Sequence, residues 1–236
     1  MSEIQKRILN IVMAVVLLVS MFLVVKESAV YVESDHVISS KEKICVVLDA
    51  GHGGSDPGKI GVNNVYEKDV NLQIAKLVKL FLENADVEVV MTRESDGRTY
   101  NQKQSNNKMQ DMMERIAIIE NADPAIVVSI HQNSYQEEYV HGAQVFYYTT
   151  SESGKELAQM LQERIRLSAD VGNTREIKAN DSYFLLKKTS VPIAIVECGF
   201  LSNWEEAERL NTSYYQEKMA WSIFMGIMQY INNQSK

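Results

Sequence analysis

Cysteine is scarce in this chain of 236 residues, which contains only Cys45 and Cys198. Small secreted proteins that depend on several disulfides are therefore excluded. Each cysteine lies within a run of apolar residues that is typical of a buried strand, so we expect two buried thiols that pack as small hydrophobic side chains. The alternative is a single long-range disulfide between them, which an environment outside the cell would permit.

Positive charge is also in deficit, because 24 lysines and arginines stand against 31 aspartates and glutamates and give a net charge of −7. Such a chain repels phosphate backbones, so nucleic acid is not expected as a partner. The sequence has no internal repeat. Hydrophobic residues make up 45% and charged residues 23%, proportions that indicate a folded protein rather than a disordered one. We therefore expect one folded domain.

One long hydrophobic run is present near the N-terminus, at residues 8–25. It contains only Asn10 and Ser20 as polar residues and is about long enough to cross a bilayer. Lys6 and Arg7 precede the run, whereas the charges that follow it cancel, so the positive-inside tendency keeps the N-terminus in the cytoplasm. We predict a transmembrane signal-anchor that holds the rest of the chain outside the cytoplasmic membrane.

The polar segment that follows, residues 26–42, lacks helical or strand periodicity and is interpreted as a tether. It contains a weak small-residue cleavage site at residues 28–30. The alternative to an anchor is therefore a signal peptide that is cleaved there, which would leave the domain secreted. The predicted organisation is a cytoplasmic tip and anchor at 1–25, the tether at 26–42 and a catalytic domain at 43–236.

Short apolar runs rich in β-branched residues alternate with amphipathic stretches through the remaining chain. The clearest helix is predicted at 67–83, and the polar stretch 94–108 is interpreted as a long surface loop. This alternation, with nearly continuous apolar strands, predicts an α/β fold in which helices cover both faces of a mostly parallel twisted sheet. The predicted strands cover 44–49, 87–92, 125–130, 143–149 and 193–197, and the other helices about 109–122, 152–169 and 214–232.

The residues that follow the predicted strands carry most information about function, since an open α/β sheet binds ligands at the carboxyl ends of its strands. His52 follows the first strand and His131 the third, while Glu67 opens the helix after the first loop. Their side chains can therefore converge at one edge of the sheet. Two imidazoles and one carboxylate form a known type of catalytic zinc set, which leaves a fourth position open for water.

Zinc in such a set lowers the pKa of a bound water from roughly 15.7 to about 7 and polarises a carbonyl, which suits the hydrolysis of an amide. Glu197 ends the last predicted strand at the same edge and can carry a proton from the attacking water to the leaving amine. The ordinary alternatives are a loop role for each histidine and a helix N-terminal acid for Glu67. Of the other histidines, His36 lies in the tether and His141 is a candidate residue of the cleft.

The glycine-rich stretch at 51–60 does not fit a nucleotide-binding loop. Its lysine, Lys59, is followed by Ile60 instead of the serine or threonine of a P-loop. Pro57 and Gly58 stand where the helix of a dinucleotide-binding motif would begin. We expect these glycines to allow close packing of the backbone around a metal-bound histidine.

The chain contains four segments that together are more specific than any single motif: VVLDAGHGGSDPG, YEKDVNL, SIHQNS and PIAIVECGFLSN. In order and spacing they resemble the signature segments of the zinc-dependent N-acetylmuramoyl-L-alanine amidases, and the resemblance covers about residues 44–230. It implies a zinc enzyme that hydrolyses the amide between the lactyl group of N-acetylmuramic acid and L-alanine in peptidoglycan. By matching position, it implies His52, Glu67 and His131 as metal ligands. Glu197 would be the catalytic glutamate.

The resemblance is incomplete on the substrate side. Many relatives carry an Arg-Gly pair and a Leu-Arg pair where this chain has Arg175 with Glu176 and Leu186 with Lys187. Arg175 and Lys187 are candidate partners for a peptide carboxylate, and Asn133 is a further candidate substrate contact. Solvated surface charge is the alternative role for Arg175 and Lys187.

A signal-anchor followed by one amidase domain without wall-binding repeats resembles the germination-specific, spore-cortex amidases of spore-forming bacteria. This architecture implies the first step of muramic-δ-lactam formation, carried out in the intermembrane space of the forespore, with a separate deacetylase in the same pathway. It also implies that either the membrane or a membrane-associated protein partner helps the enzyme to reach the glycan strand and stem peptide of peptidoglycan.

Two other classes of protein remain alternatives. A zinc carboxypeptidase that acts on wall peptides shares the α/β architecture and the two-histidine, one-carboxylate site, but its H-x-x-E ligand pair is missing, since Ser55 stands at that offset from His52. A non-catalytic, membrane-anchored glycan-binding protein would have lost turnover. Retention of all the candidate site residues argues against that class.

Overall fold

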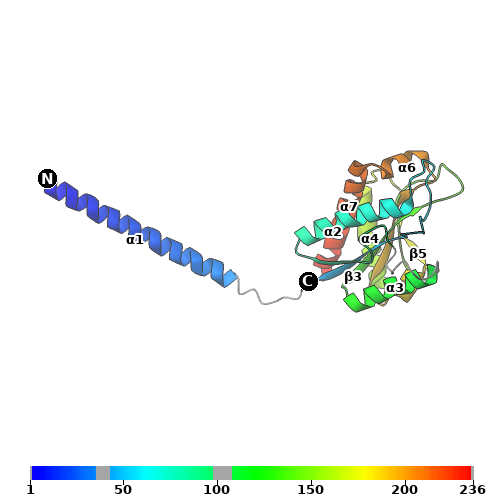
Figure 1. Cartoon of the computed structure of the whole chain (residues 1–236), viewed down its shortest axis with the longest axis horizontal. Helices are drawn as coiled ribbons and strands as arrows, with labels where there is room; N and C mark the ends of the chain where they lie inside the picture. The colour runs from blue at the N-terminus through cyan, green and yellow to red at the C-terminus, as the bar shows by residue number, and fades with distance from the viewer. Residues whose placement is uncertain (1, 36–42, 98–107, 235–236) are drawn as a thin grey trace. The chain divides into compact units, whose positions relative to one another are not determined.

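The structure is a computed structural model that describes residues 2–35, 43–97 and 108–234. It separates into two compact units, Met1–Lys43 and Ile44–Lys236. The described part of the first unit forms helix α1 at Glu3–Asp35 (Figure 1). Within this helix, Glu3–Phe22 is long and apolar enough to cross a membrane, a criterion that a membrane anchor and a signal sequence both satisfy.

Helix α1 continues past the hydrophobic run and includes residues 26–35. The structure therefore differs from the irregular tether that the sequence predicts there. This segment contains neither glycine nor proline, and a helix that has already nucleated extends at little cost in free energy. The rest of the predicted tether, with His36, lies outside the described residues, as do residues 98–107 of the predicted surface loop.

The second unit is built on a six-stranded sheet with the order β2-β1-β3-β6-β4-β5 in the described part of the chain. Strands β2, β1, β3 and β6 are parallel, whereas β4 is antiparallel to β6 and parallel to β5, so the sheet is mixed and mostly parallel. All five predicted strands are present, and β5 was missed because three residues are too few to show a periodic pattern. The strands are β1 (Cys45–Ala50), β2 (Glu88–Met91), β3 (Ile126–Asn133), β4 (Gln144–Tyr148), β5 (Lys178–Asn180) and β6 (Ile193–Phe200).

The four predicted helices of this unit are present as well. Ser151 caps α4 by accepting a hydrogen bond from the backbone N–H of Gly154 at 3.0 Å, in agreement with the serine-rich sequence at its start. Two short helices, α5 and α6, were missed because five and seven residues form fewer than two helical turns. The helices are α2 (Glu67–Asn84), α3 (Lys108–Ala122), α4 (Glu152–Leu167), α5 (Phe184–Lys188), α6 (Trp204–Leu210) and α7 (Ser213–Gln234).

Helices cover both faces of the sheet (Figure 1). Helices α2, α4 and α7 bury the larger hydrophobic cluster against one face, and α3 and α5 bury a smaller cluster against the other. Alternate residues of one strand point to opposite faces, so Val46 and Leu48 of β1 belong to the larger cluster and Val47 to the smaller. This burial on both faces explains why the strands are apolar throughout.

Both cysteines are free thiols, as expected. Cys198 is fully buried in β6, and Cys45 is half-buried at the start of β1. Burial raises the pKa of the Cys198 thiol far above its usual range, so this side chain stays protonated and packs as an apolar group.

Candidate metal centre

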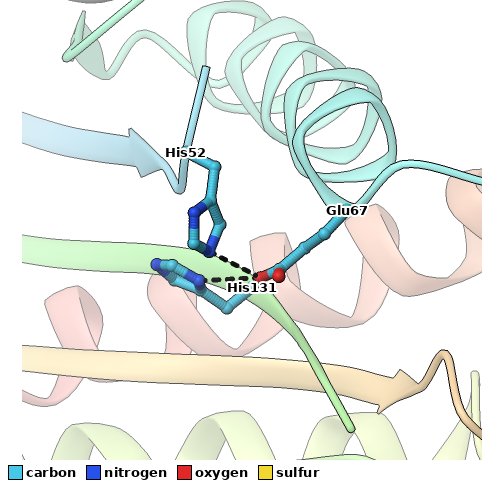
Figure 2. Close-up of side chains that lie close together, drawn as sticks. All are labelled: His52, Glu67 and His131. Atoms are coloured by element: carbon cyan, nitrogen blue, oxygen red, sulfur yellow. Dashed lines mark hydrogen bonds and ion pairs between the residues drawn. The ribbon is translucent and has the colours of Figure 1, made fainter. Parts of the chain in front are cut away.

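The three side chains that the sequence singles out as metal ligands meet at the carboxyl edge of the sheet. The Nε2 atom of His52 lies 3.2 Å, and the Nδ1 atom of His131 lies 2.9 Å, from the Oε1 atom of Glu67. Figure 2 shows both imidazoles turned toward this one carboxylate oxygen. One ligand atom from each residue lies within 4.8 Å of the others. The set is therefore compact enough for a single metal ion to contact all three residues.

His131 and Glu197 lie inside strands β3 and β6, whereas the sequence analysis put both at or beyond the strand ends. Both strands are longer than predicted: His131, Gln132 and Asn133 continue β3 beyond its apolar run, and β6 continues to Phe200. His131 stands opposite Glu197 in the parallel register. Residues paired in this way share a face of the sheet, so the Glu197 side chain is held beside that of His131.

The loop after β1 carries His52 and depends on glycine for its close approach to the other ligands. A Cβ atom at Gly51 would lie 2.2 Å from the His131 ring. One at Gly58, whose φ is +67°, would lie 2.5 Å from Oε2 of Glu67 and 2.7 Å from Cδ2 of His52. The loop backbone therefore packs directly against the three candidate ligands, which is the role predicted for these glycines.

We expect Gly51→Ala to weaken metal binding by about tenfold or more, as changes around metal ligands commonly do. The added methyl group would overlap the His131 imidazole, whose ring must then turn away from Glu67. Chelator competition measures the affinity, and circular dichroism checks the fold. The control is Gly97→Ala, because among the described residues a Cβ there would meet only the hydroxyl of Ser95, at 3.3 Å. Unchanged affinity in Gly51→Ala would contradict the close packing described above.

Two buried arginines hold the His52 loop by donating hydrogen bonds to its backbone carbonyl oxygens. Arg115 donates to the carbonyls of Ala50 at 2.9 Å and His52 at 2.8 Å. Arg93 donates to those of Ala50 at 2.8 Å and Gly51 at 3.0 Å. Neither residue was predicted from the sequence, in which the signal for Arg115 is a cation on the apolar face of a predicted helix. These bonds fix the loop that positions the first histidine.

Asp49, which is fully buried at the end of β1, balances the charge of Arg115. Ser129 and Thr92 each donate a hydroxyl hydrogen bond to its carboxylate. Burial alone would raise the pKa of Asp49, but the charge of Arg115 and these hydrogen bonds outweigh it and lower the pKa to about 2. The carboxylate is therefore ionised at neutral pH and keeps Arg115 in place beneath the loop.

Glu67 is the first residue of α2 and is almost fully buried. Its Oε2 accepts the backbone N–H of Lys59 at 2.7 Å, and its Oε1 accepts that of Gln132 at 3.1 Å. Burial would raise the pKa of this carboxyl, but hydrogen bonds and charge from His131 and His52 lower it well below its usual range. Glu67 is thus an anion at neutral pH and an oxygen ligand for a cation.

Asp56 is a site residue that the sequence analysis missed. Its Oδ2 lies 3.0 Å from Nδ1 of His52, the ring nitrogen that does not face Glu67, and its Oδ1 accepts the N–H of Gly58 at 3.1 Å. A carboxylate behind a ligating histidine fixes the tautomer and orientation of the ring. The only sequence signal was an acid four residues after His52, which many loops share.

Glu197 is buried beside the three ligands and has one hydrogen-bond partner in the described part of the chain. The hydroxyl of Tyr183, just before α5, donates to its Oε1 at 3.4 Å, while its Oε2 is buried and has no partner among the described residues. Burial raises the pKa of Glu197 to about 7. Burial and the nearby charge of Glu197 raise that of Tyr183 to about 12. A carboxyl with a pKa near 7 is suited to proton transfer at neutral pH.

A cavity of about 540 Å³ at the carboxyl edge of the sheet is lined by the three candidate ligands, Tyr183 and Glu197. Its wall also includes Lys108 and Met112 of α3 and Phe184 of α5. A cavity of this volume admits a small molecule or one segment of a larger substrate. The arrangement can bind a divalent cation next to a carboxyl that exchanges protons, which is the chemistry required to hydrolyse an amide.

Comparison with known proteins agrees with this chemistry. The sequence profile described as N-acetylmuramoyl-L-alanine amidase matches residues 46–229. The chain belongs to this amidase family. The germination-specific N-acetylmuramoyl-L-alanine amidase of Bacillus subtilis (strain 168) is 34% identical to it over 192 residues, which cover 80% of this chain and 80% of that protein. The resemblance inferred from the four sequence segments is therefore confirmed, and the chain is a peptidoglycan amidase.

Solved amidase structures share the fold. The CwlD amidase from Clostridioides difficile, determined in complex with the GerS lipoprotein, matches with a TM-score of 0.76 and 36% identity, covering 81% of this chain and all of that one. The amidase AmiC2 of Nostoc punctiforme matches with a TM-score of 0.70 and 34% identity, covering 80% of this chain and 97% of that one. The predicted α/β architecture of a single amidase domain is confirmed.

The three candidate substrate contacts of this amidase differ in their position. Asn133 lines the cavity, whereas Arg175 and Lys187 are not among its lining residues. The Nε atom of Arg175 donates to the carbonyl of His141 at 2.6 Å, and its guanidinium lies 4.7 Å from the ring centre of Phe200. Lys187 is exposed on α5, and His141 is also exposed. The structure therefore groups Asn133 with the ligands and leaves the two cations outside the cavity.

Proposed function

We propose that this amidase is a zinc enzyme in which His52, Glu67 and His131 hold the metal. The observation that carries the proposal is the convergence of two imidazole nitrogens on one ionised, buried carboxylate. Zinc in catalytic sites takes histidine nitrogens and carboxylate oxygens as ligands, so the donor set fits this metal. When bound, zinc supplies a water with a pKa of about 7 and polarises the carbonyl of the amide.

Glu197 is the proton carrier of the proposed reaction. It takes a proton from the attacking water and passes it to the leaving amine of L-alanine. Burial raises the pKa of Glu197 above its usual range, which favours a carboxyl that takes up a proton and releases it again. Tyr183 donates a hydrogen bond to Oε1 of Glu197, which holds this carboxyl in the cavity wall. Asp56 keeps the ring of His52 in the orientation that directs Nε2 toward the other ligands.

The test is a digest of purified peptidoglycan with the full-length protein in detergent, followed by mass spectrometry of the products. New stem peptides with a free L-alanyl amine are expected. Loss of a terminal residue would instead indicate a carboxypeptidase, and unchanged muropeptides would indicate a glycan-binding protein without turnover. Treatment with a chelator should abolish the release of stem peptides, and added zinc should restore it, whereas chelator-resistant activity would reject the zinc proposal.

The catalytic domain is proposed to work outside the cytoplasmic membrane. In this arrangement residues 1–25 form the cytoplasmic tip and signal-anchor, residues 26–42 connect it to the domain, and residues 43–236 form the domain. The apolar helix at Glu3–Phe22 supports an anchor or a signal sequence. The substrate also supports a location of the domain outside the cytoplasmic membrane, because peptidoglycan lies there. Signal cleavage would leave the domain secreted rather than anchored.

A role in the spore cortex is proposed from the relatives. The similarity to the germination-specific amidase and to CwlD supports action in the intermembrane space of the forespore. Removal of the stem peptide there exposes the lactyl carboxyl of muramic acid, and a separate deacetylase must act before a lactam ring can close. The CwlD structure contains a lipoprotein, which supports a membrane-associated protein partner for this chain as well.

Deleting the gene and analysing cortex muropeptides tests the cortex role. Spores of the mutant are expected to lack muramic-δ-lactam, because the amide must be cut before the lactam forms. Complementation with the wild-type gene should restore the lactam. Normal lactam in the mutant spores would reject the cortex role and leave the amidase activity standing.

A further inference from the structure

The substrate of this amidase is a polymer, and the cavity at the candidate metal centre is too small to enclose it. A volume of about 540 Å³ holds a group the size of a small ligand. A glycan strand with its stem peptides must therefore continue across the surface beside the cavity. The side chains exposed there decide how the rest of the strand is held.

Three large aromatic side chains are exposed on the two segments that follow β3 and β6. Tyr135 directly follows the cavity-lining Ser134 on the loop after β3 and is 58% exposed. Tyr139 on the same loop is 75% exposed, and Trp204 at the start of α6 is 61% exposed. Strands β3 and β6 are neighbours in the sheet, so the segments that follow them leave its carboxyl edge together. Exposed aromatic groups gathered in one region commonly mark a binding surface.

Hydrogen bonds join these two segments into one surface. The backbone N–H of Tyr135 donates to Oγ of Ser202 at 2.9 Å, and Nδ2 of Asn203 donates to the carbonyl of Glu138 at 2.8 Å. The first of these bonds is made by the residue after Ser134, which is part of the cavity wall. The aromatic side chains thus extend from a held backbone that is continuous with the cavity.

We propose that Tyr135, Tyr139 and Trp204 form an aromatic rim that binds the saccharide strand beyond the muramic acid residue being cut. The proposal rests on the peptidoglycan substrate of the proposed function. Sugar rings have apolar C–H faces that pack on aromatic rings, and aromatic side chains lose little conformational entropy on binding. The tyrosine hydroxyls and the indole N–H also offer hydrogen bonds to sugar hydroxyls.

The charge around the aromatic rim favours the glycan over the stem peptide as its occupant. Glu137, Glu138 and Glu205 are exposed on the same two segments. Their negative charge repels the carboxylates of the stem peptide. The saccharide of the uncut strand carries no such charge, because each lactyl carboxyl is still bound as an amide. The strand therefore lies along the rim, and the stem peptide leaves the cavity on another side.

The test compares soluble substrates of different length: a single disaccharide with its stem peptide, and a strand of several such disaccharides. Tyr135→Ala combined with Trp204→Ala should lower kcat/KM about tenfold on the long strand, mainly through KM, and leave the disaccharide value unchanged. Trp221→Ala, which removes an exposed tryptophan from α7, is the control and should leave both values unchanged. Zinc content should match the wild type in all variants, and circular dichroism should show that all are folded; Trp221→Ala should lower the melting temperature, because Trp221 packs on Phe81 and Phe224.

Equal losses on both substrates, or no loss on the long strand, would overturn the proposal. Sedimentation with peptide-free glycan strands gives a second measurement that does not depend on turnover. The wild type is expected to bind these strands, and the double variant about tenfold more weakly. Unchanged strand binding would assign the aromatic rim to a protein partner instead. If the wild type cleaves neither substrate, the proposed function fails, yet the sedimentation result still decides whether the rim binds glycan.

Discussion

Replacing His131 with alanine is expected to abolish both zinc binding and amidase activity. The change removes one of the three proposed ligand atoms, the nitrogen that lies 2.9 Å from Glu67. The affinity for zinc should fall by more than the roughly 10- to 100-fold that follows from changes to outer-shell partners, because a direct ligand is lost. Elemental analysis of the purified protein measures the zinc, and release of stem peptides measures the activity.

His141→Ala is the matched control for this variant. His141 is exposed and is not among the residues that line the cavity, so its replacement should leave zinc content and turnover unchanged. Stoichiometric zinc with full turnover in His131→Ala would reject the assignment of this histidine as a ligand. Equal effects of the two substitutions would also contradict it.

Replacing Glu197 with glutamine is expected to reduce turnover by about 10²- to 10⁴-fold while zinc and fold are retained. The amide is nearly the same size and can still accept the hydrogen bond from Tyr183, but it cannot take up a proton from water. Because protonated Glu197 cannot act as a base, kcat/KM of the wild type should also fall as the pH is lowered and this carboxyl takes up a proton. The residual activity of the variant should lack this dependence.

Glu205→Gln provides the control for the loss of a carboxylate. Glu205 is exposed on α6, so the same chemical change there should alter neither turnover nor its pH dependence on a short substrate. Loss of zinc together with activity in Glu197→Gln would make Glu197 a metal ligand. In that case the proposed division of roles among the site residues would be wrong.

The fold was largely predictable because its elements are long enough to show a pattern. Helix α2 carries an apolar stripe over 18 residues, and β1, β3 and β6 are apolar because both of their faces are buried. Elements of three to seven residues, β5, α5 and α6, escaped prediction since their conformation depends on neighbours in space. The antiparallel pairing of β4 with β6 was also absent from the local pattern.

The residues around the candidate site were less predictable than the candidate ligands. His52, Glu67 and His131 stand out because they occur where parallel strands and a helix meet one sheet edge. Arg115 acts from α3 on the carbonyl of His52, and Tyr183 reaches Glu197 from the residue before α5. No spacing in the chain reports such contacts, because partners from separate elements are joined only when the sheet forms.

The amino-acid sequence by itself determined the class of fold, the amidase family and the residue types available for a metal, since periodicity, motif order and donor chemistry are local properties of the chain. The tertiary structure alone decided which buried groups hold the His52 loop, that Glu197 is desolvated to a pKa of about 7, and that Arg175 and Lys187 stay outside the cavity. These features depend on burial and on distances between elements remote in sequence, and both quantities exist only after the helices have packed on the sheet.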